Sequence, residues 1–350
     1  MTTQKSRSAT TDVERVLESV GVKASHKAKV SPEAGGRASR LGNYGVVFFL
    51  VVLVVGFSIA QPARFPTLTN AQTMLSDMAI PAMLALAVTL PLSVGEFDLS
   101  VGATLGFNSI LVAYLTSHGT PVLIAVLAAL VTGCLIGAVN ALLVVGIGVN
   151  AFIATLGTAT VLAGLNLLVS GGATIFEGIP GSLKSIAQTE VAGLTLPVFY
   201  CAAIAVLLWY LLEHTPYGRF LRATGLGREA ARLSGVSTRR MLASSFVVAG
   251  ALAGLCGMLQ TARIGSATAS TGPEFLLPAY AAAFLGSTTI KRGKFNVWGT
   301  VVGVLLLSVG ITGLTFAGAP FWIPNVFNGT ALILAVSITV LVTRRTADRR

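Results

Sequence analysis

Residues 75–115 read LSDMAIPAMLALAVTLPLSVGEFDLSVGATLGFNSILVAYL, an apolar stretch that is interrupted once, by Gly95-Glu96-Phe97-Asp98-Leu99-Ser100-Val101-Gly102. A helix that crosses about 30 Å of hydrocarbon needs about 20 apolar residues, so the stretch is long enough for two spans. Irregular backbone at membrane depth is tolerated only where protein or a watery cavity surrounds it. The stretch therefore predicts two membrane helices with a helix break between them.

Similar apolar blocks fill most of the chain. Of its 350 residues, 54% are hydrophobic and only 11% are charged. Soluble domains carry about 25% charged residues, so this composition excludes an ordinary soluble protein. We predict an all-α, polytopic membrane domain over residues 44–343, with some helices broken or re-entrant. The ten predicted spans are 44–60, 74–92, 99–117, 121–145, 151–170, 194–213, 241–262, 274–290, 296–316 and 325–343.

The basic residues predict the orientation of these spans. Lys and Arg outnumber Asp and Glu by 24 to 13, and 21 of the 24 fall on one face of a ten-span chain. Those 21 lie in the tail 1–43, the loop 214–240, the turn 291–295 and the tail 344–350. Because short cytoplasmic loops are enriched in Lys and Arg, we expect both termini in the cytoplasm and the chain in a bacterial inner membrane. Basic residues that punctuate apolar blocks indicate a lipid bilayer as the surroundings and argue against nucleic acid as a partner.

The N-terminal tail has the composition of a disordered segment, since residues 1–43 are rich in Ser, Thr, Lys, Arg and Gly. Within it, Thr11–Glu14 has the spacing of a capping box, and apolar residues follow at helical intervals. Two interpretations stay open: a short amphipathic helix against the membrane or a partner, and a solvated tail.

Acidic residues at or near membrane depth are candidates for function, because a charge there is costly. They are Asp77, Glu96, Asp98 and Glu274. Asp98 and Ser100 suit the start of a helix, where a carboxylate or hydroxyl accepts from free backbone amides. Three roles stay open for Asp98: a helix cap, a polar contact with a passing substrate, and a proton relay.

The loop 214–240 is too long for a simple turn and contains a helix-prone core. This core reads Arg228-Glu229-Ala230-Ala231-Arg232-Leu233 and is followed by Ser234-Gly235. A short helix with a small apolar face between charges suits docking into a groove on a soluble partner. The alternative is that its arginines only fix the topology.

The sequence offers no catalytic or metal site. Cys134, Cys201 and Cys256 lie far apart inside apolar blocks, the three histidines are scattered, and no phosphate-binding loop is present. We therefore expect no directly bound cofactor. Uphill transport would take its energy from an ion gradient or from a nucleotide-binding partner.

The motifs together resemble a known family. Glu229-Ala230-Ala231 followed by Gly235 is similar to the motif by which permeases of ATP-binding-cassette (ABC) transporters contact their ATPase. Combined with the Gly95–Gly102 segment, Phe152-Ile153-Ala154-Thr155-Leu156-Gly157-Thr158 and Trp298-Gly299-Thr300, it resembles the ribose-type, monosaccharide branch of these permeases. Glu96, Asp98, Ser100, Thr155 and Glu274 are then candidates for the translocation path or the helix break.

The resemblance implies a transport subunit and not an enzyme. It implies a second permease copy, as a homodimer or heterodimer, a cytoplasmic ATPase that binds ATP and Mg²⁺, and an extracytoplasmic solute-binding protein. The cargo would be a monosaccharide or a related polyol. The alternatives are an amino-acid permease of the same superfamily, an ion-coupled secondary transporter, and an intramembrane enzyme.

Three departures from the family pattern bear on the cargo and on helix geometry. Glu96 stands where a glycine or small residue is expected, Pro278 interrupts a late span, and Arg292-Gly293-Lys294 lacks one of two glycines.

Overall fold

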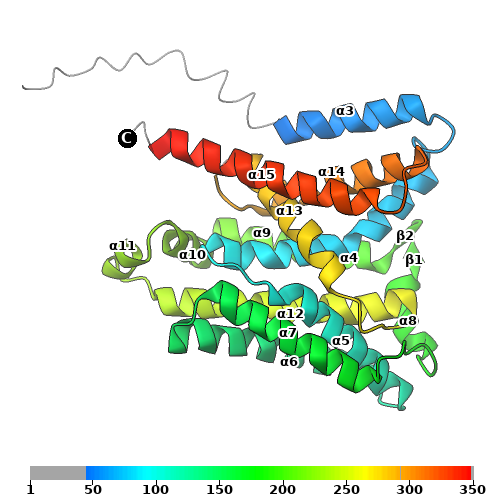
Figure 1. The fold of residues 1–350 in the computed structure, drawn as a ribbon, viewed down its shortest axis with the longest axis horizontal. Helices are drawn as coiled ribbons and strands as arrows, with labels where there is room; N and C mark the ends of the chain where they lie inside the picture. The colour runs from blue at the N-terminus through cyan, green and yellow to red at the C-terminus, as the bar shows by residue number, and fades with distance from the viewer. Residues whose placement is uncertain (1–44, 292, 348–350) are drawn as a thin grey trace, which may run out of the picture. The chain divides into compact units, whose positions relative to one another are not determined.

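A computed structural model describes residues 45–291 and 293–347 of the chain, which belong to one unit, and the side chains up to residue 337. The expected N-terminal tail with its possible helix at Thr11–Glu14, Arg292 and residues 348–350 lie outside the described residues. The described chain is almost entirely helical (Figure 1).

Each of the ten predicted spans contains a helix, with ends within a few residues of the prediction for most. The long helices are α3 (Gly45–Ala60), α4 (Leu68–Ser93), α5 (Ser100–Ser117), α6 (Val122–Ala141), α7 (Ala151–Ser170), α9 (Leu196–His214), α12 (Thr238–Ile264), α13 (Pro273–Thr288), α14 (Val297–Phe316) and α15 (Ile323–Ala347). A π-helical turn, Leu142–Ile147, continues α6.

Six helices of the described chain are long and apolar enough to cross a membrane: Leu68–Ser93, Val122–Ile147, Ala151–Ser170, Leu196–His214, Thr238–Ile264 and Val297–Phe316. Two more apolar helices are shorter, Gly45–Ala60 and Ile323–Ser337. A helical chain with several membrane spans is therefore confirmed. The total of ten spans and the location of the termini stay predictions.

The connections contain structure that the hydropathy pattern does not predict. Helix α8 (Gly181–Gln188) and the antiparallel strands β1 (Glu190–Val191) and β2 (Leu194–Thr195) precede α9, while α10 (Pro216–Leu226) and α11 (Arg228–Leu233) follow it. Figure 1 shows α8 and the hairpin at one end of the long helices, and α10 with α11 at the other.

Helix α4 forms the centre of the core. Its side chains are almost continuously buried from Ala79 to Leu92, and it packs against α9, α12, α13 and α14. Thr67 caps the start of the helix, since its hydroxyl accepts a hydrogen bond of 3.2 Å from the Asn70 amide. It ends at Ser93, just before the interruption that the sequence marks.

Glycines bring helix pairs into backbone contact. A Cβ at Gly133 would meet the carbonyl oxygen of Gly250, and one at Gly254 would meet that of Ala129, so α6 and α12 pack with no side chain between them. Such close approach is typical of small residues four apart in membrane helices. This glycine seam lies within a single subunit.

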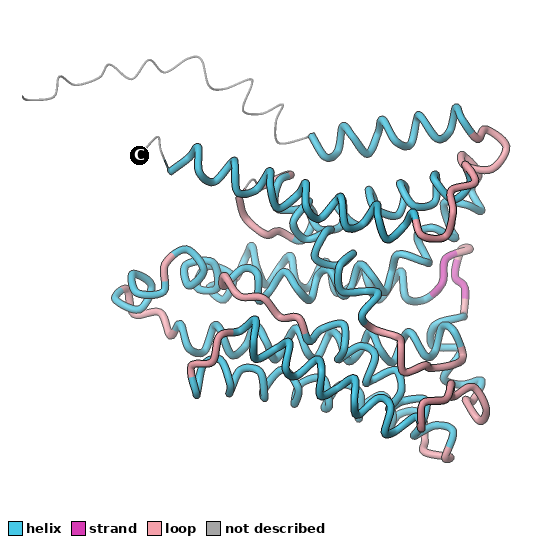
Figure 2. Tube along the Cα trace, in the orientation of Figure 1, coloured by secondary structure: helices cyan, strands magenta, loops and turns pink. Residues whose placement is uncertain are grey.

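Two helices begin after extended connections inside the unit. Residues 94–99 lead from α4 to α5, and residues 265–272 lead from α12 to α13. Figure 2 shows both connections as loops that run beside the helices. The starts of α5 and α13 touch, since a Cβ at Gly102 would lie 2.9 Å from the carbonyl oxygen of Gly272. The predicted helix break at residues 95–102 is thus part of a crossing of two helix starts.

Candidate functional site

Asp98 lies at the start of α5 and is buried. One carboxylate oxygen, Oδ1, accepts from the Ser100 amide at 3.0 Å and from the Ser100 hydroxyl at 2.6 Å. Asp98 thereby satisfies the free amide of Ser100, the first residue of α5, although Leu99 is the residue directly before the helix. The other oxygen, Oδ2, is buried and has no hydrogen-bond partner among the described residues. Asp98 can therefore cap α5 and still offer one acceptor.

Tyr280 of α13 holds the backbone of Asp98 from the opposite side. Its hydroxyl accepts from the Asp98 amide at 2.9 Å and donates to the Asp98 carbonyl at 2.9 Å. Phe97 stacks on Tyr280 and on Phe284, with ring centroids 5.9 and 6.3 Å apart. The interrupted segment is thereby fixed to α13.

Helices α6 and α7 complete this polar cluster. Asn140 Nδ2 donates to the Ser100 hydroxyl at 2.8 Å, and Thr158 donates to Asn140 Oδ1 at 2.7 Å. The hydroxyl of Thr155 accepts from the Leu99 amide at 3.1 Å. Asp98, Ser100 and Thr155 thus meet in one buried cluster. The sequence analysis did not select Asn140, although an Asn inside an apolar helix was a visible signal.

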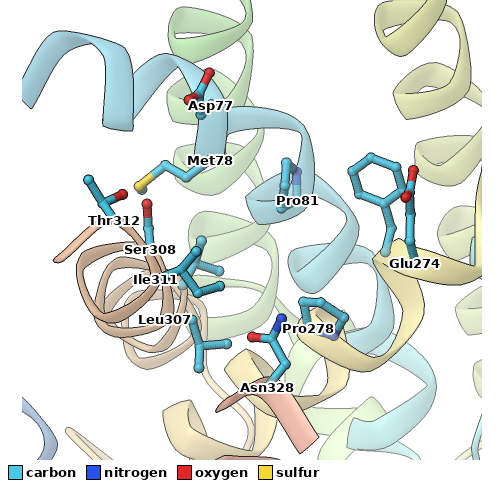
Figure 3. Close-up of a pocket in the computed structure, with 12 residues that line it drawn as sticks. Asp77, Met78, Pro81, Glu274, Pro278, Leu307, Ser308, Ile311, Thr312 and Asn328 are labelled. Atoms are coloured by element: carbon cyan, nitrogen blue, oxygen red, sulfur yellow. The ribbon is translucent and has the colours of Figure 1, made fainter. Parts of the chain in front are cut away.

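Glu274 and Glu96 lie apart from this cluster. Glu274 is an exposed residue in the first turn of α13 and lines a separate cavity with Asp77 (Figure 3). Glu96, whose side chain is 17% exposed, forms an ion pair with Arg228, the first residue of α11. The four acidic candidates therefore occupy three different environments.

Helix α11 begins and ends where the sequence predicts. It covers Arg228–Leu233, and Gly235 follows with φ of +82°, a conformation that favours glycine. Within it, Arg232 donates to Glu229 at 2.7 Å. Ala231 is buried, whereas Leu226 and Leu233 are exposed by 82% and 81%. An apolar surface flanked by charges is thus free in the single chain.

Helix α10, which the sequence analysis missed, supports α11. A Cβ at Gly225 would meet the carbonyl oxygen of Ser93, so the end of α10 packs directly on the end of α4. Tyr217 shares a hydrogen bond of 3.0 Å with Ser244 of α12. Burial raises the pKa of the Tyr217 phenol, which keeps it protonated.

An ion-pair group ties the same end of the helices together. Glu213 of α9 pairs with Arg222 of α10 at 3.2 Å and also with Lys291, in the turn before α14. The loop 214–240 and the turn 291–295, which the charge pattern placed on one face, therefore lie close together.

No group of three or more His, Cys, Asp or Glu side chains within residues 45–291 and 293–337 has a metal-binding arrangement. The three cysteines are free thiols, and Cys256 is buried.

Comparisons with known proteins agree on a class of transporter subunit. The family model described as the permease component of the branched-chain amino acid transport system matches residues 70–336. No solved structure matches the chain.

Three relatives illustrate the similarity. The ribose import permease of Escherichia coli K12 is 31% identical over 292 residues, which are 83% of this chain and 91% of the relative. The D-allose transport system permease of the same strain is 29% identical over 302 residues, 86% of this chain and 92% of the relative. The autoinducer 2 import system permease of Escherichia coli HS is 32% identical over 292 residues, 82% and 88% of the two chains.

Proposed function

The chain belongs to the family of branched-chain amino acid transport system permease components, and on this premise we propose that it is the membrane-spanning subunit of an ABC importer for a monosaccharide or related polyol. The observation that carries the proposal is the similarity over more than four-fifths of the chain to permeases for ribose and D-allose. Because the family is described by branched-chain amino acid transport, an amino acid is the nearest alternative cargo.

The proposed topology has ten spans in a bacterial inner membrane, with both termini in the cytoplasm. It is supported by the charge bias and by the separation of α10 and α11 from the β1–β2 hairpin (Figure 1). On this topology the α10–α11 end faces the cytoplasm, and the hairpin with α8 faces outward.

We propose that α11 is the helix that docks on the ATPase. The exposed side chains of Leu233 at its end and of Leu226 at the end of α10 are apolar, and Arg228, Glu229 and Arg232 surround them with charges. An amphipathic helix of this kind fits a groove on a partner. ATP and Mg²⁺ would then be bound and used by the ATPase, and this subunit would carry no catalytic residue.

The contacts of α11 and α10 supply a route from the ATPase to the membrane interior. Arg228 pairs with Glu96, Gly225 packs on Ser93, and the segment that follows leads to Asp98 at the start of α5. A movement of the docking helix would therefore be transmitted to the helix break. We expect a second permease copy to complete the path and an external binding protein to deliver the cargo, in alternating access.

The deciding experiment reconstitutes the chain with its ATPase and binding protein in proteoliposomes. We expect ATP-dependent uptake of a labelled monosaccharide that unlabelled sugars reduce and leucine does not. Uptake driven by an ion gradient without the ATPase would establish a secondary transporter instead. ATP-dependent uptake of labelled leucine that sugars do not reduce would establish the amino-acid alternative.

A further inference from the structure

A cavity of about 470 Å³ lies between α4, α13, α14 and the beginning of α15 (Figure 3). Pockets for small molecules usually enclose about 300–1,000 Å³, so the space suits one small ligand. Five polar side chains line it: Asp77, Glu274, Ser308, Thr312 and Asn328. The buried Asp98 cluster does not contribute to its walls.

Asn328 is the most informative of these residues. It is only 8% exposed, and its Oδ1 is buried without a hydrogen-bond partner among the described residues. Figure 3 shows its side chain on the cavity wall among Pro278 and Leu307. A buried amide oxygen without a partner is unfavourable, so a hydrogen-bond donor from a ligand would satisfy it.

The charges around the cavity limit the kind of ligand. The Asp77 carboxylate pairs with Arg263, which also donates to the Asp77 carbonyl at 3.3 Å. Glu274 forms no ion pair within the described side chains. None of the lining residues is Lys, Arg or His.

A ligand carboxylate or phosphate would therefore find no basic side chain in the lining. The start of α13 offers backbone amides, but Glu274 in its first turn disfavours an anion there. The cavity is thus better suited to a neutral molecule than to an amino acid or a sugar phosphate.

The remaining walls are apolar and include Phe275, Pro278, Leu307 and Ile311. The cavity thus has polar groups on one part of its wall and apolar surface on another. Such a wall can contact both the hydroxyls and the C–H groups of a polyhydroxyl molecule. Ser308 and Thr312 can both donate to and accept from such hydroxyls, whereas Glu274 accepts.

We propose that this cavity is a binding site for a neutral polyhydroxyl molecule of monosaccharide size, with Asn328 Oδ1 accepting from a ligand hydroxyl. The assignment rests on the proposed function for the class of cargo. It adds a site within a single subunit and a reason why a carboxylate-bearing cargo is disfavoured.

The test measures equilibrium binding of labelled ribose to the full-length chain in lipid nanodiscs, without ATPase or binding protein. We expect saturable binding at millimolar sugar that ribitol displaces and that leucine and ribose 5-phosphate do not. Asn328→Leu should weaken binding about tenfold or more, because the buried acceptor is lost. Thr312→Val, which keeps the side-chain shape, should weaken it less and provides a second test if Asn328→Leu folds poorly.

Asn108→Leu is the matched control. Asn108 is also buried with an unpartnered Oδ1, but it lies in α5 and does not line the cavity. Three outcomes would overturn the site. The wild type would fail to bind ribose, leucine would displace ribose as well as ribitol does, or Asn328→Leu and Thr312→Val would both leave binding unchanged. ATP-driven uptake by the complete transporter is measured separately. Sugar uptake without binding to the isolated chain would reject the site and keep the proposed function, whereas binding without ATP-driven uptake would keep the site and reject the proposed function.

Discussion

Arg228, the first residue of α11, pairs with Glu96, which lies 132 positions earlier in the segment between α4 and α5. Glu96 is the acid that stands where the resemblance predicts a glycine or small residue. The structure places its side chain against Arg228 of α11, the proposed docking helix, away from the buried polar cluster. A residue that the sequence assigned to the translocation path or helix break thus connects that break to the cytoplasmic side of the proposed topology.

The ion pair predicts a coupling phenotype. Glu96→Gln and Arg228→Gln should each lower the sugar transported per ATP hydrolysed while changing stability by only about 0.2–1 kcal/mol, because Arg228 is 49% exposed. The double exchange Glu96→Arg with Arg228→Glu should recover part of the coupling. Uptake and ATP hydrolysis are measured in the same proteoliposomes, and wild-type coupling in both single variants would contradict the prediction.

Asp98 should behave as a helix cap. Asp98→Asn keeps an acceptor for the Ser100 amide and should be mild, whereas Asp98→Ala should cost about 0.5–2 kcal/mol. Thermal unfolding in lipid nanodiscs and uptake report the two effects. If both variants matched the wild type in stability and in transport, the Asp98 side chain would be dispensable and the prediction would be wrong.

Docking should depend on Gly235 and Glu229. Gly235→Val places a β-branched residue at φ of +82° and should distort the end of α11. Glu229→Arg reverses a charge at the proposed interface, where loss of one partner of a desolvated pair costs about 2–5 kcal/mol. Both variants should insert into the membrane yet lose co-purification of the ATPase.

Lys184→Gln provides the control, because it removes a charge from α8, at the end of the long helices away from α11 (Figure 1). Full ATP-dependent uptake by well-inserted Gly235→Val and Glu229→Arg would reject docking and favour arginines that only fix the topology.

The glycine seam predicts a strong contrast between two alanine substitutions. Gly250→Ala would push a methyl group into the Gly133 carbonyl and should destabilise the fold by about 1–3 kcal/mol. Gly164→Ala in α7 meets nothing within 4 Å and should be neutral or stabilising. Equal melting temperatures for the two purified variants would show that α6 and α12 are not packed as described.

Reporter fusions test the topology. A reporter after His118 or Lys184 should lie outside, and one after Gly227 or Arg350 should lie inside, because the proposed ten-span topology puts 21 of 24 basic residues on one face. An external location at Gly227 would require a different number of spans.

Helix positions were predictable because most of the long helices are nearly continuous apolar runs, and several of them end beside Gly, Pro or charged residues. Helix α11 was predictable for a local reason, since Glu229 to Gly235 contains both its helix formers and its terminator. The start of α4 was missed by six residues because Leu68–Thr73 is polar, although Thr67 caps it.

The contacts that build the candidate site were harder to predict from the sequence. Tyr280 meets Asp98 across 182 positions, and nothing in the periodicity of either segment pairs them. The partner of Glu96 was hidden for the same reason. Local patterns predict helices and caps, whereas contacts between distant helices depend on which faces turn toward each other.

The seam between α6 and α12 also has a mechanical consequence. Gly133 and Gly137 face Gly250, and Ala129 faces Gly254, in an antiparallel register. A Cβ at Gly133, Gly137, Gly250 or Gly254 would meet backbone atoms of the facing helix, so a side chain at any of these positions would push the two helices apart. We therefore expect α6 and α12 to move together as one rigid pair during transport, with any rearrangement of the bundle taking place at other helix contacts.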